Sequence, residues 1–455
     1  MQTADMDLTV AQELLPLPAG AGQEPSSWGA RHAHDPTVVQ DCDGTYYMFS
    51  TDAVANSRDI PAGVHIRTSS DLVEWTYLRT AFDGVPAAAA EWSGAKGLWA
   101  PEVVRWPDGR WHMYYSASTF GSNTSAIGLA VAPSPAGPWE DMGLVVATRK
   151  GEHSQNAIDA AVAFDAHGTP WLTYGSFFSG IYILPLDRTS GLPRVPGDLG
   201  SVIARRHRAV EGAVEGAFIL RRPHDGRYVL FTSYDSLFST YNVRAAVADR
   251  ITGPYRDFRG LAATDVDAPP AAVGTKVLGS YQFDGGTGWL APGHNSVFTR
   301  TGPDGATEHF VVHHVRFAED PSQHVVQLRR LFFTAGGWPV ISPQPFAGAR
   351  SEALPSPAAV AGTWQVVRFD PESADLVRSI LMEVECLDAS PAAFQGKPAA
   401  VRLRAAEPGN RPGAGVELDA VVFGSWDWSR KRPALSFSGI DQHGVAWSGT
   451  REGLL

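Results

Sequence analysis

Alternating apolar and polar positions recur in five short units along the chain, and each unit turns at a glycine. In the first unit, the strand-like residues 37–39 are followed by Asp43-Gly44, and an aromatic stretch returns over residues 45–49. Alternation with a period of two predicts half-buried strands, and an Asp-Gly or His-Gly pair supplies the positive φ that a tight hairpin needs. Each unit therefore predicts a β-hairpin, with turn glycines at Gly44, Gly109, Gly168, Gly226 and Gly305.

The spacing of these turns predicts the architecture. Positions 44, 109, 168, 226 and 305 are 65, 59, 58 and 79 residues apart, which is room for a four-stranded sheet with its loops. Repetition of one β unit at such a period is typical of a radial array, so five copies predict an all-β, five-bladed β-propeller. The alternative is a β-sandwich whose hairpins resemble one another by chance.

A polar residue stands near the start of the first strand in every unit, and we call these five residues the heads. The innermost strands of a propeller line its channel, so equivalent positions point toward one axis. Buried like charges are costly, and a fold that needed only packing would have apolar residues there. The heads therefore predict a functional site at one mouth of the channel, formed by Asp35, Glu102, Asp159, Glu215 and His294.

Composition divides the chain into four parts. Residues 1–30 are polar and rich in Ala, Gly and Pro, and we expect an arm that helps to close the ring. Residues 31–346 contain the five units and form the predicted catalytic propeller. The Ala/Pro/Ser/Gly-rich stretch 347–361 is a predicted linker. Short strand-like runs over 362–455 predict a small C-terminal antiparallel β barrel or sandwich.

Charge and cysteine content narrow the range of partners. The formal net charge is -11 and Lys and Arg form no cluster, which argues against nucleic acid as a partner. The two cysteines, Cys42 and Cys386, imply no disulfide framework. Residues 1–22 lack the pattern of a signal peptide, and no later stretch suits a membrane, so we expect a cytoplasmic protein. The oligomeric state is left open.

The carboxylate heads suit the cleavage of a glycosidic bond. That reaction needs a protonated acid for the leaving oxygen and an ionised base to activate water. A third carboxylate nearby would raise the pKa of the acid and keep it protonated near neutral pH. Aromatic side chains in the same loops can stack on the C–H faces of sugars. The candidates are Trp92, Trp99, Phe120, Phe177, Phe178, Tyr281 and Trp289, and of these Trp99, Phe120 and Phe177 are expected to bind substrate.

Six motifs in this order resemble glycoside hydrolase family 43, in its arabinanase-like branch. They are His34-Asp35-Pro36, Trp99-Ala100-Pro101-Glu102, Asn156-Ala157-Ile158-Asp159, Gly175-Ser176-Phe177-Phe178-Ser179-Gly180, Glu215-Gly216-Ala217-Phe218 and Pro292-Gly293-His294-Asn295. The resemblance covers residues 30–345, and the tail after 362 is similar to the β domain of some members. It departs from many relatives at Ala160 and Ala217, where those have Pro.

This resemblance implies a five-bladed propeller that hydrolyses with inversion at the anomeric carbon. It implies that Asp35 is the general base, Glu215 the general acid, and Asp159 the residue that orients and tunes the acid. Glu211 could be mistaken for the acid, but only Glu215 precedes the Gly-Ala-Phe strand. We expect the substrate-binding residues to be His34, Trp99, Glu102, Phe120, Asn156, Ser176, Phe177 and Arg329.

The resemblance also implies a cofactor. His294 resembles the channel histidine that holds Ca²⁺, or another small ion, through water. By itself a lone His is more often a satisfied polar group than a ligand, and the sequence has no acidic cage beside His294.

The predicted function is hydrolysis of α-1,5-linked L-arabinofuranosidic bonds in arabinan or arabino-oligosaccharides. The same three acids would also serve a β-xylosidase or an α-L-arabinofuranosidase. A different class remains open, namely a carbohydrate-binding propeller without activity, although a pure binder has no reason to keep three acids in one desolvated place. Endo or exo action depends on loops that residue types do not define.

Overall fold

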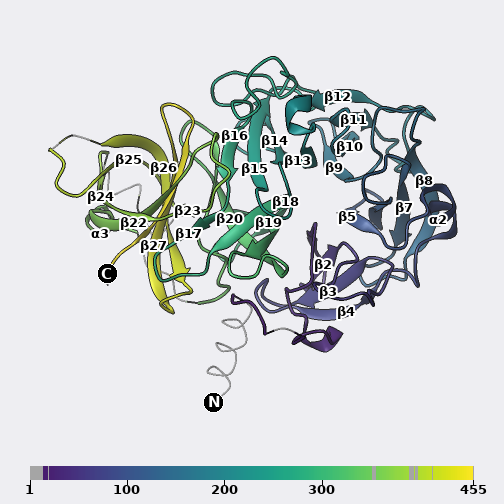
Figure 1. The fold of residues 1–455 in the computed structure, drawn as a ribbon, viewed down its shortest axis with the longest axis horizontal. Helices are drawn as coiled ribbons and strands as arrows, with labels where there is room; N and C mark the ends of the chain where they lie inside the picture. Colours follow the sequence, from purple (N-terminus) through teal and green to yellow (C-terminus); the bar gives the residue numbers. More distant parts are fainter. Residues whose placement is uncertain are drawn as a thin grey trace.

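Five antiparallel sheets follow one another around a ring in the computed structural model of this chain (Figure 1). The structure describes residues 14–18, 20–350, 355–388, 394, 398–411, 413 and 415–453. Each sheet forms one blade, and in the first four blades the strands are hydrogen-bonded in the order of the sequence. The prediction of a five-bladed propeller is confirmed.

The first blade shows how the alternating pattern becomes structure. Strand β1 (Thr37–Gln40) pairs antiparallel with β2 (Tyr46–Ser50), with Val38 opposite Met48. Gly44, at the turn between them, has a φ of 92°, which glycine adopts without steric cost. Strands β3 (His65–Ser69) and β4 (Thr76–Thr80) complete the sheet.

The other elements of the propeller repeat this plan. The second blade contains β5 (Trp99–Arg105), β6 (Trp111–Ala117), β7 (Ser125–Ala132) and β8 (Glu140–Thr148). The third contains β9 (Ala161–Phe164), β10 (Pro170–Tyr174), β11 (Ile181–Pro185) and β12 (Ser201–Ala204). The fourth contains β13 (Val214–Arg221), β14 (Tyr228–Tyr234), β15 (Asn242–Ala248) and β16 (Thr275–Leu278). The short helices of the described residues are η1 (Pro25–Ser27), α2 (Ala87–Ser93), η2 (Arg208–Val210) and α3 (Pro357–Val360).

The fifth blade is a six-stranded sheet that also joins the two parts of the molecule. It contains β17 (Tyr281–Gln282), β18 (Trp289–Thr301), β19 (Thr307–Phe317), β20 (His324–Phe333), β21 (Pro339–Ile341) and β23 (Val377–Arg378). The strand β23 comes from the C-terminal part and pairs in parallel with β17. Backbone hydrogen bonds therefore tie that part to the propeller.

The C-terminal part is a closed six-stranded barrel, as the sequence predicts. It contains β22 (Gly362–Phe369), β24 (Ile380–Cys386), β25 (Ala399–Ala406), β26 (Val416–Asp427), β27 (Arg432–Asp441) and β28 (Ala446–Arg451). Trp364 and Phe437 meet edge to face in its core, with ring centroids 5.3 Å apart. Figure 1 shows the barrel beside the fourth and fifth blades, on the side away from the second blade.

The segment after the predicted arm closes the ring. Arg31 forms an antiparallel bridge with Val325, at the start of β20. Two backbone bonds flank this bridge, from Val326 N–H to Ala30 O and from His32 N–H to His324 O. The two ends of the propeller are thereby held by main-chain pairing, which does not depend on particular side chains.

Buried histidines gather at this closure. His34 stacks on His314 with ring centroids 3.8 Å apart, and His324 meets His34 edge to face at 4.4 Å. His32 has one ring nitrogen 3.0 Å from the Gly22 carbonyl, while the other accepts the Ala55 N–H, so its bonds suit the neutral ring. Burial, followed by smaller effects, lowers the pKa of His32 to about 4 and that of His324 well below its ordinary value.

These pKa shifts predict acid destabilisation of the closure. A histidine whose pKa is lowered by folding contributes stability above its unfolded pKa, near 6.5, and this stability is lost as the pH falls toward the folded value. Replacing His324 by Leu removes one such histidine. The substitution breaks no side-chain hydrogen bond, because no partner is found for the His324 ring nitrogens among the described residues. The free energy of unfolding should then fall less between pH 7 and pH 5, by roughly 1–3 kcal/mol, in urea titrations.

The control is His167→Gln, at an exposed turn. It should keep the wild-type pH dependence. An unchanged pH dependence in His324→Leu would contradict the assignment.

Candidate active site

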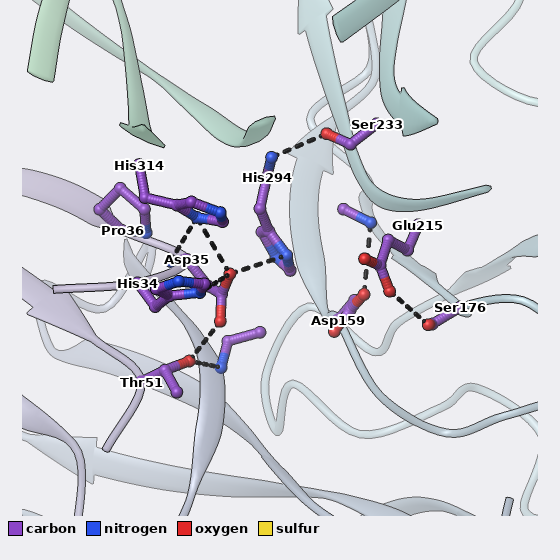
Figure 2. Close-up of polar contacts among 12 residues, drawn as sticks. His34, Asp35, Pro36, Thr51, Asp159, Ser176, Glu215, Ser233, His294 and His314 are labelled. Atoms are coloured by element: carbon purple, nitrogen blue, oxygen red, sulfur yellow. Dashed lines mark hydrogen bonds and ion pairs between the residues drawn. The ribbon is translucent and has the colours of Figure 1, made fainter. Parts of the chain in front are cut away.

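Four of the five heads meet in a cavity of about 930 Å³ at the mouth of the channel. Asp35, Asp159, Glu215 and His294 all line it. Figure 2 shows Asp35 on one side of His294, with Asp159 and Glu215 on the other. The cavity therefore brings the three predicted acids and the predicted histidine together.

The backbone at these heads departs from regular strand geometry. Asp35, Asp159 and His294 have φ values of 51°, 61° and 47°, in the left-handed region that costs non-glycine residues about 1–3 kcal/mol each. The pairing of β13 with β14 also shifts register between Glu215 and Phe218. Such irregularities re-aim side chains, so these heads point into the cavity instead of alternating across a sheet.

Hydroxyl groups of one blade fix the heads of the next blade. Ser116, on the second strand of the second blade, accepts the backbone N–H of Asp159 at 3.0 Å. Ser233, on the second strand of the fourth blade, accepts the N–H of His294 at 2.7 Å. Asp159 and His294 are therefore each positioned by the neighbouring blade.

The same bond closes the ring with a different acceptor. His314, on β19 of the fifth blade, faces the backbone N–H of Asp35, with 3.3 Å between Nδ1 and the amide nitrogen. Thr51, just after the second strand of the first blade, accepts the N–H of Ala100 at 2.7 Å. Asp35 is thus held from the fifth blade by an imidazole where the first, second and fourth blades use a hydroxyl.

The carboxylate of Asp35 lies among polar groups that favour its ionised form. The Thr51 hydroxyl donates to Oδ2 at 2.6 Å. His294 Nδ1 lies 3.2 Å from Oδ1, His314 Nδ1 3.4 Å and His34 Nδ1 3.5 Å. His314 Nδ1 accepts the Asp35 backbone N–H, so it has no proton to donate to the carboxylate. Burial alone would raise the pKa of Asp35, but the charge of His294, assisted by His34, holds it well below its usual value. Asp35 is therefore ionised at neutral pH.

The tautomer of His34 follows from its other neighbour. Arg316 Nη2 lies 3.1 Å from His34 Nε2, and a guanidinium can only donate. Nε2 must then accept, which leaves the proton on Nδ1, facing Asp35. Arg316 also donates to the carbonyl of Leu237, which lines the cavity. One side chain therefore contacts both the His34 ring beside Asp35 and the wall of the cavity.

Glu215 is held by two hydroxyl donors. Ser176 donates to Oε2 at 2.7 Å, and Tyr241 donates to Oε1 at 2.8 Å. Burial raises the pKa of Glu215 above its ordinary value, although His294 and the two hydroxyls oppose the shift. This carboxyl group is oriented on both oxygens and keeps its proton to higher pH than an exposed glutamate.

Asp159 lies beside the Glu215 segment. Its Oδ2 accepts the backbone N–H of Gly216 at 3.3 Å. Burial raises the pKa of Asp159 to about 7; His294 opposes the shift, and the charges of Glu215 and Asp35 add to it. Since both pKa values on this side of the cavity are raised, the pair retains a proton toward neutral pH.

His294 supplies the positive charge among the acids. Burial would lower its pKa, but Asp35, Asp159 and Glu215 together raise it above the ordinary value. Gly216 leaves room for the ring, because a Cβ there would lie 3.0 Å from His294 Cα and 3.1 Å from Cγ. The local chain is therefore built around this imidazole.

Six of the eight expected substrate-binding residues line the cavity. Phe120 is 80% exposed, which suits a surface platform more than packing between blades. Asn156 and Ser176 make internal bonds, the first with the hydroxyl of Ser125 and the second with Glu215, so they also support the site. The six residues are His34, Trp99, Phe120, Asn156, Ser176 and Phe177.

Glu102 and Arg329 lie outside the cavity, which corrects their expected role. Glu102 is buried between blades, where Thr37 and the Val162 backbone bond to it, and burial raises its pKa to about 8. Arg329 is fully buried in the fifth blade, where its guanidinium is bound by Gln327, Tyr281 and the carbonyls of Ser342 and Pro343. Neither side chain can reach a sugar in the cavity.

Several functional side chains were missed from the sequence. Tyr241, His314 and Arg316 carry no motif, because the residues that they contact lie far from them in the chain. The three hydroxyl residues that accept an N–H of the next blade are Thr51, Ser116 and Ser233, and they do have a sequence signal. Each lies seven residues after the turn glycine of its blade, at Gly44, Gly109 and Gly226. The exposed Phe178, one of the candidate sugar-stacking aromatics, lines the cavity, and so does the exposed Phe238, which was not a candidate.

Two places in the site have side chains that could bind a metal ion: the group His34, Asp35 and His314, and the single residue His294. His34, Asp35 and His314 approach within metal-binding distance of one another, but His34 Nε2 and His314 Nδ1 already take part in hydrogen bonds. His294 directs Nδ1 at Asp35, which leaves Nε2 as its free ligand atom. One nitrogen without an oxygen cage suits an ion that keeps most of its water, unlike a fully caged Ca²⁺.

The comparisons with known proteins agree with this geometry. The family model described as glycosyl hydrolases family 43 matches residues 29–339. The chain is 28% identical over 459 residues to the extracellular endo-alpha-(1->5)-L-arabinanase 2 of Bacillus subtilis, covering 92% of each. It is 32% identical to the extracellular exo-alpha-(1->5)-L-arabinofuranosidase ArbA of Cellvibrio japonicus, over 68% of this chain and 86% of that protein.

A solved structure gives the same result. The crystal structure of endo-1,5-alpha-L-arabinanase from Thermotoga petrophila has a TM-score of 0.77 and 25% identity, covering 94% of this chain and all of that one.

No helix in the described part of the chain has the length and apolar character needed to cross a membrane. The expectation of a cytoplasmic protein has no support, since two of these relatives are named extracellular. The chain belongs to glycoside hydrolase family 43.

Proposed function

We propose that this glycoside hydrolase cleaves α-1,5-L-arabinofuranosidic bonds in arabinan or arabino-oligosaccharides, with inversion at the anomeric carbon. The observation that carries the proposal is the split in pKa across one cavity. Asp35 has a pKa well below its usual value, whereas Glu215 and Asp159 have raised values. An ionised base and a protonated acid are the two groups that this hydrolysis needs.

The residues act in one step. Asp35 accepts a proton from water, and the water oxygen bonds to the anomeric carbon on the face opposite the leaving group. The glycosidic C–O bond breaks as Glu215 gives its proton to the leaving oxygen. Burial, with the charge of Asp35, raises the pKa of Glu215. Asp159 accepts the Gly216 N–H, so it would orient the acid and, when ionised, help to tune it.

The relatives support the arabinan substrate, because those described above are named for α-1,5-L-arabinose chemistry. The cavity, at about 930 Å³, has room for more than one pentose unit. The test is to incubate the purified chain with linear arabinan, arabino-oligosaccharides and aryl pentosides, and to separate the products by size. Cleavage of xylosides alone would overturn the substrate assignment, and no cleavage at all would favour a binding module.

A small cation beside His294 is part of the proposal. His294 would hold it through Nε2, with water completing its shell, and the ion would supply positive charge beside the three acids. A protonated His294 supplies the same charge, and the two states exclude each other because the ligand nitrogen must be unprotonated.

Replacing Asp35 by Asn tests the base. The substitution keeps the shape of the side chain but removes the proton acceptor, so kcat should fall by about two to four powers of ten. Circular dichroism and the thermal midpoint should show a folded protein. Turnover close to that of the wild type would remove Asp35 from the base role.

Replacing Glu215 by Gln tests the acid through the leaving group. Hydrolysis of arabino-oligosaccharides should be crippled, while an aryl arabinofuranoside whose phenolate leaves without a proton should lose far less. Glu211→Gln is the comparison, since Glu211 is exposed at the cavity rim, and its loss should be small on both substrates. Equal losses for Glu215→Gln on the two substrates would point away from an acid.

Proton NMR of the first-formed sugar tests the stereochemical course. Inversion should give the anomer opposite to that of the substrate, before mutarotation mixes the two. A retained anomer would refute the base-and-water mechanism even if all three acids proved essential.

A further inference from the structure

We infer that Tyr241 is a positioning residue for the acid, an inference that rests on the proposed function. Its hydroxyl donates to Glu215 Oε1 at 2.8 Å, while Ser176 binds the other oxygen. These two donors come from loops of different blades. Together they fix the plane of the carboxyl group, so that its proton can be directed at the leaving oxygen.

The tyrosine ring is itself locked in place. It is fully buried and packs nearly parallel to His314, with ring centroids 5.7 Å apart and an interplanar angle of 24°. Gly293 also lies against the ring, where a Cβ would be 2.0 Å from Tyr241 Cδ1. The glycine that precedes His294 therefore makes room for this ring, and any larger residue there would displace the hydroxyl.

The hydroxyl remains a donor over the whole range in which the site can work. Burial and the charges of Glu215, Asp159 and Asp35 raise the pKa of Tyr241 well above its usual value. A neutral phenol donates more usefully to a carboxylate than to a carboxylic acid, because bonds to the charged form are stronger. The bond therefore strengthens as Glu215 gives up its proton, which stabilises the transition state more than the bound substrate.

Tyr241 also joins the two halves of the site. Its hydroxyl contacts the acid, and its ring packs on the imidazole that faces the backbone of Asp35. One side chain thus sets the position of Glu215 relative to Asp35.

The experiment compares Tyr241→Phe with wild type on two substrates, an arabino-oligosaccharide and an aryl arabinofuranoside with a nitrophenolate leaving group. We expect kcat to fall about 10- to 100-fold on the oligosaccharide with KM within threefold, and to fall less than threefold on the aryl substrate. A merely structural role would lower both activities alike, and that result would overturn the inference.

Three further variants are measured alongside Tyr241→Phe on the same two substrates. Tyr255→Phe removes another buried hydroxyl, which bonds to the Ile251 carbonyl away from the cavity, and should leave both activities unchanged. Placing 4-aminophenylalanine at position 241 restores an N–H donor and should recover most of the oligosaccharide activity; absence of any recovery, with the protein folded, would count against positioning. Glu215→Gln is run in parallel. If it shows no leaving-group dependence, the proposed function fails, whereas dependence there but not in Tyr241→Phe defeats only the Tyr241 inference.

Discussion

The site depends on one repeated interaction, in which a side chain from the second strand of one blade accepts the backbone N–H near the head of the next blade. Ser116 and Ser233 make this bond with hydroxyls, to Asp159 and His294. Because the heads at Asp159 and His294 have positive φ, their amides turn toward the neighbouring blade and their side chains turn into the channel. The bond offsets part of the cost of the strained backbone, so the catalytic geometry and the contacts between blades are a single structural feature.

The cavity separates two protonation states by supplying donors unequally. Asp35 is surrounded by imidazoles and a hydroxyl, which outweigh its burial and hold it ionised. Glu215 receives two hydroxyl bonds but lies beside another acid, Asp159, and burial dominates for both. His294 lies between Asp35 on one side and Asp159 and Glu215 on the other, and all three acids attract its positive charge. Opposite pKa shifts of acids in one cavity are thus obtained from local contacts, with no need for large separations.

The sequence was sufficient for the fold because turn chemistry and alternation are local signals. Gly44 and its counterparts fix hairpins, and five hairpins at a regular spacing leave few alternatives to a propeller. The acids were also predictable, since a charged residue at a buried strand start has a physical cost. Glu102 shows the limit of this logic. Ala100, with a φ of 39° and its N–H bonded to Thr51, occupies the position equivalent to Asp159 and His294. Glu102 lies two residues farther along the strand, where it is buried and bonded by Thr37 and the Val162 backbone. Tyr241 and Arg329 show a second limit. Which tyrosine contacts an acid, and which arginine is buried in a structural role, depends on partners that lie far away in the chain.

The chemistry resides where the repeat is broken. A ring of five identical blades would give every head the same surroundings, and equal carboxyls cannot act as acid and base at one pH. The fifth blade instead supplies His314 where the first, second and fourth blades have a hydroxyl, and its head is His294 where others have an acid. Both replacements face Asp35: His314 accepts its backbone N–H, and the charge of His294 lowers the pKa of its carboxyl group. The fourth blade differs in another way, since Tyr241 reaches back to its own head, Glu215. Departures from the repeat therefore create the asymmetry that hydrolysis requires, while the repeated bonds keep the ring intact.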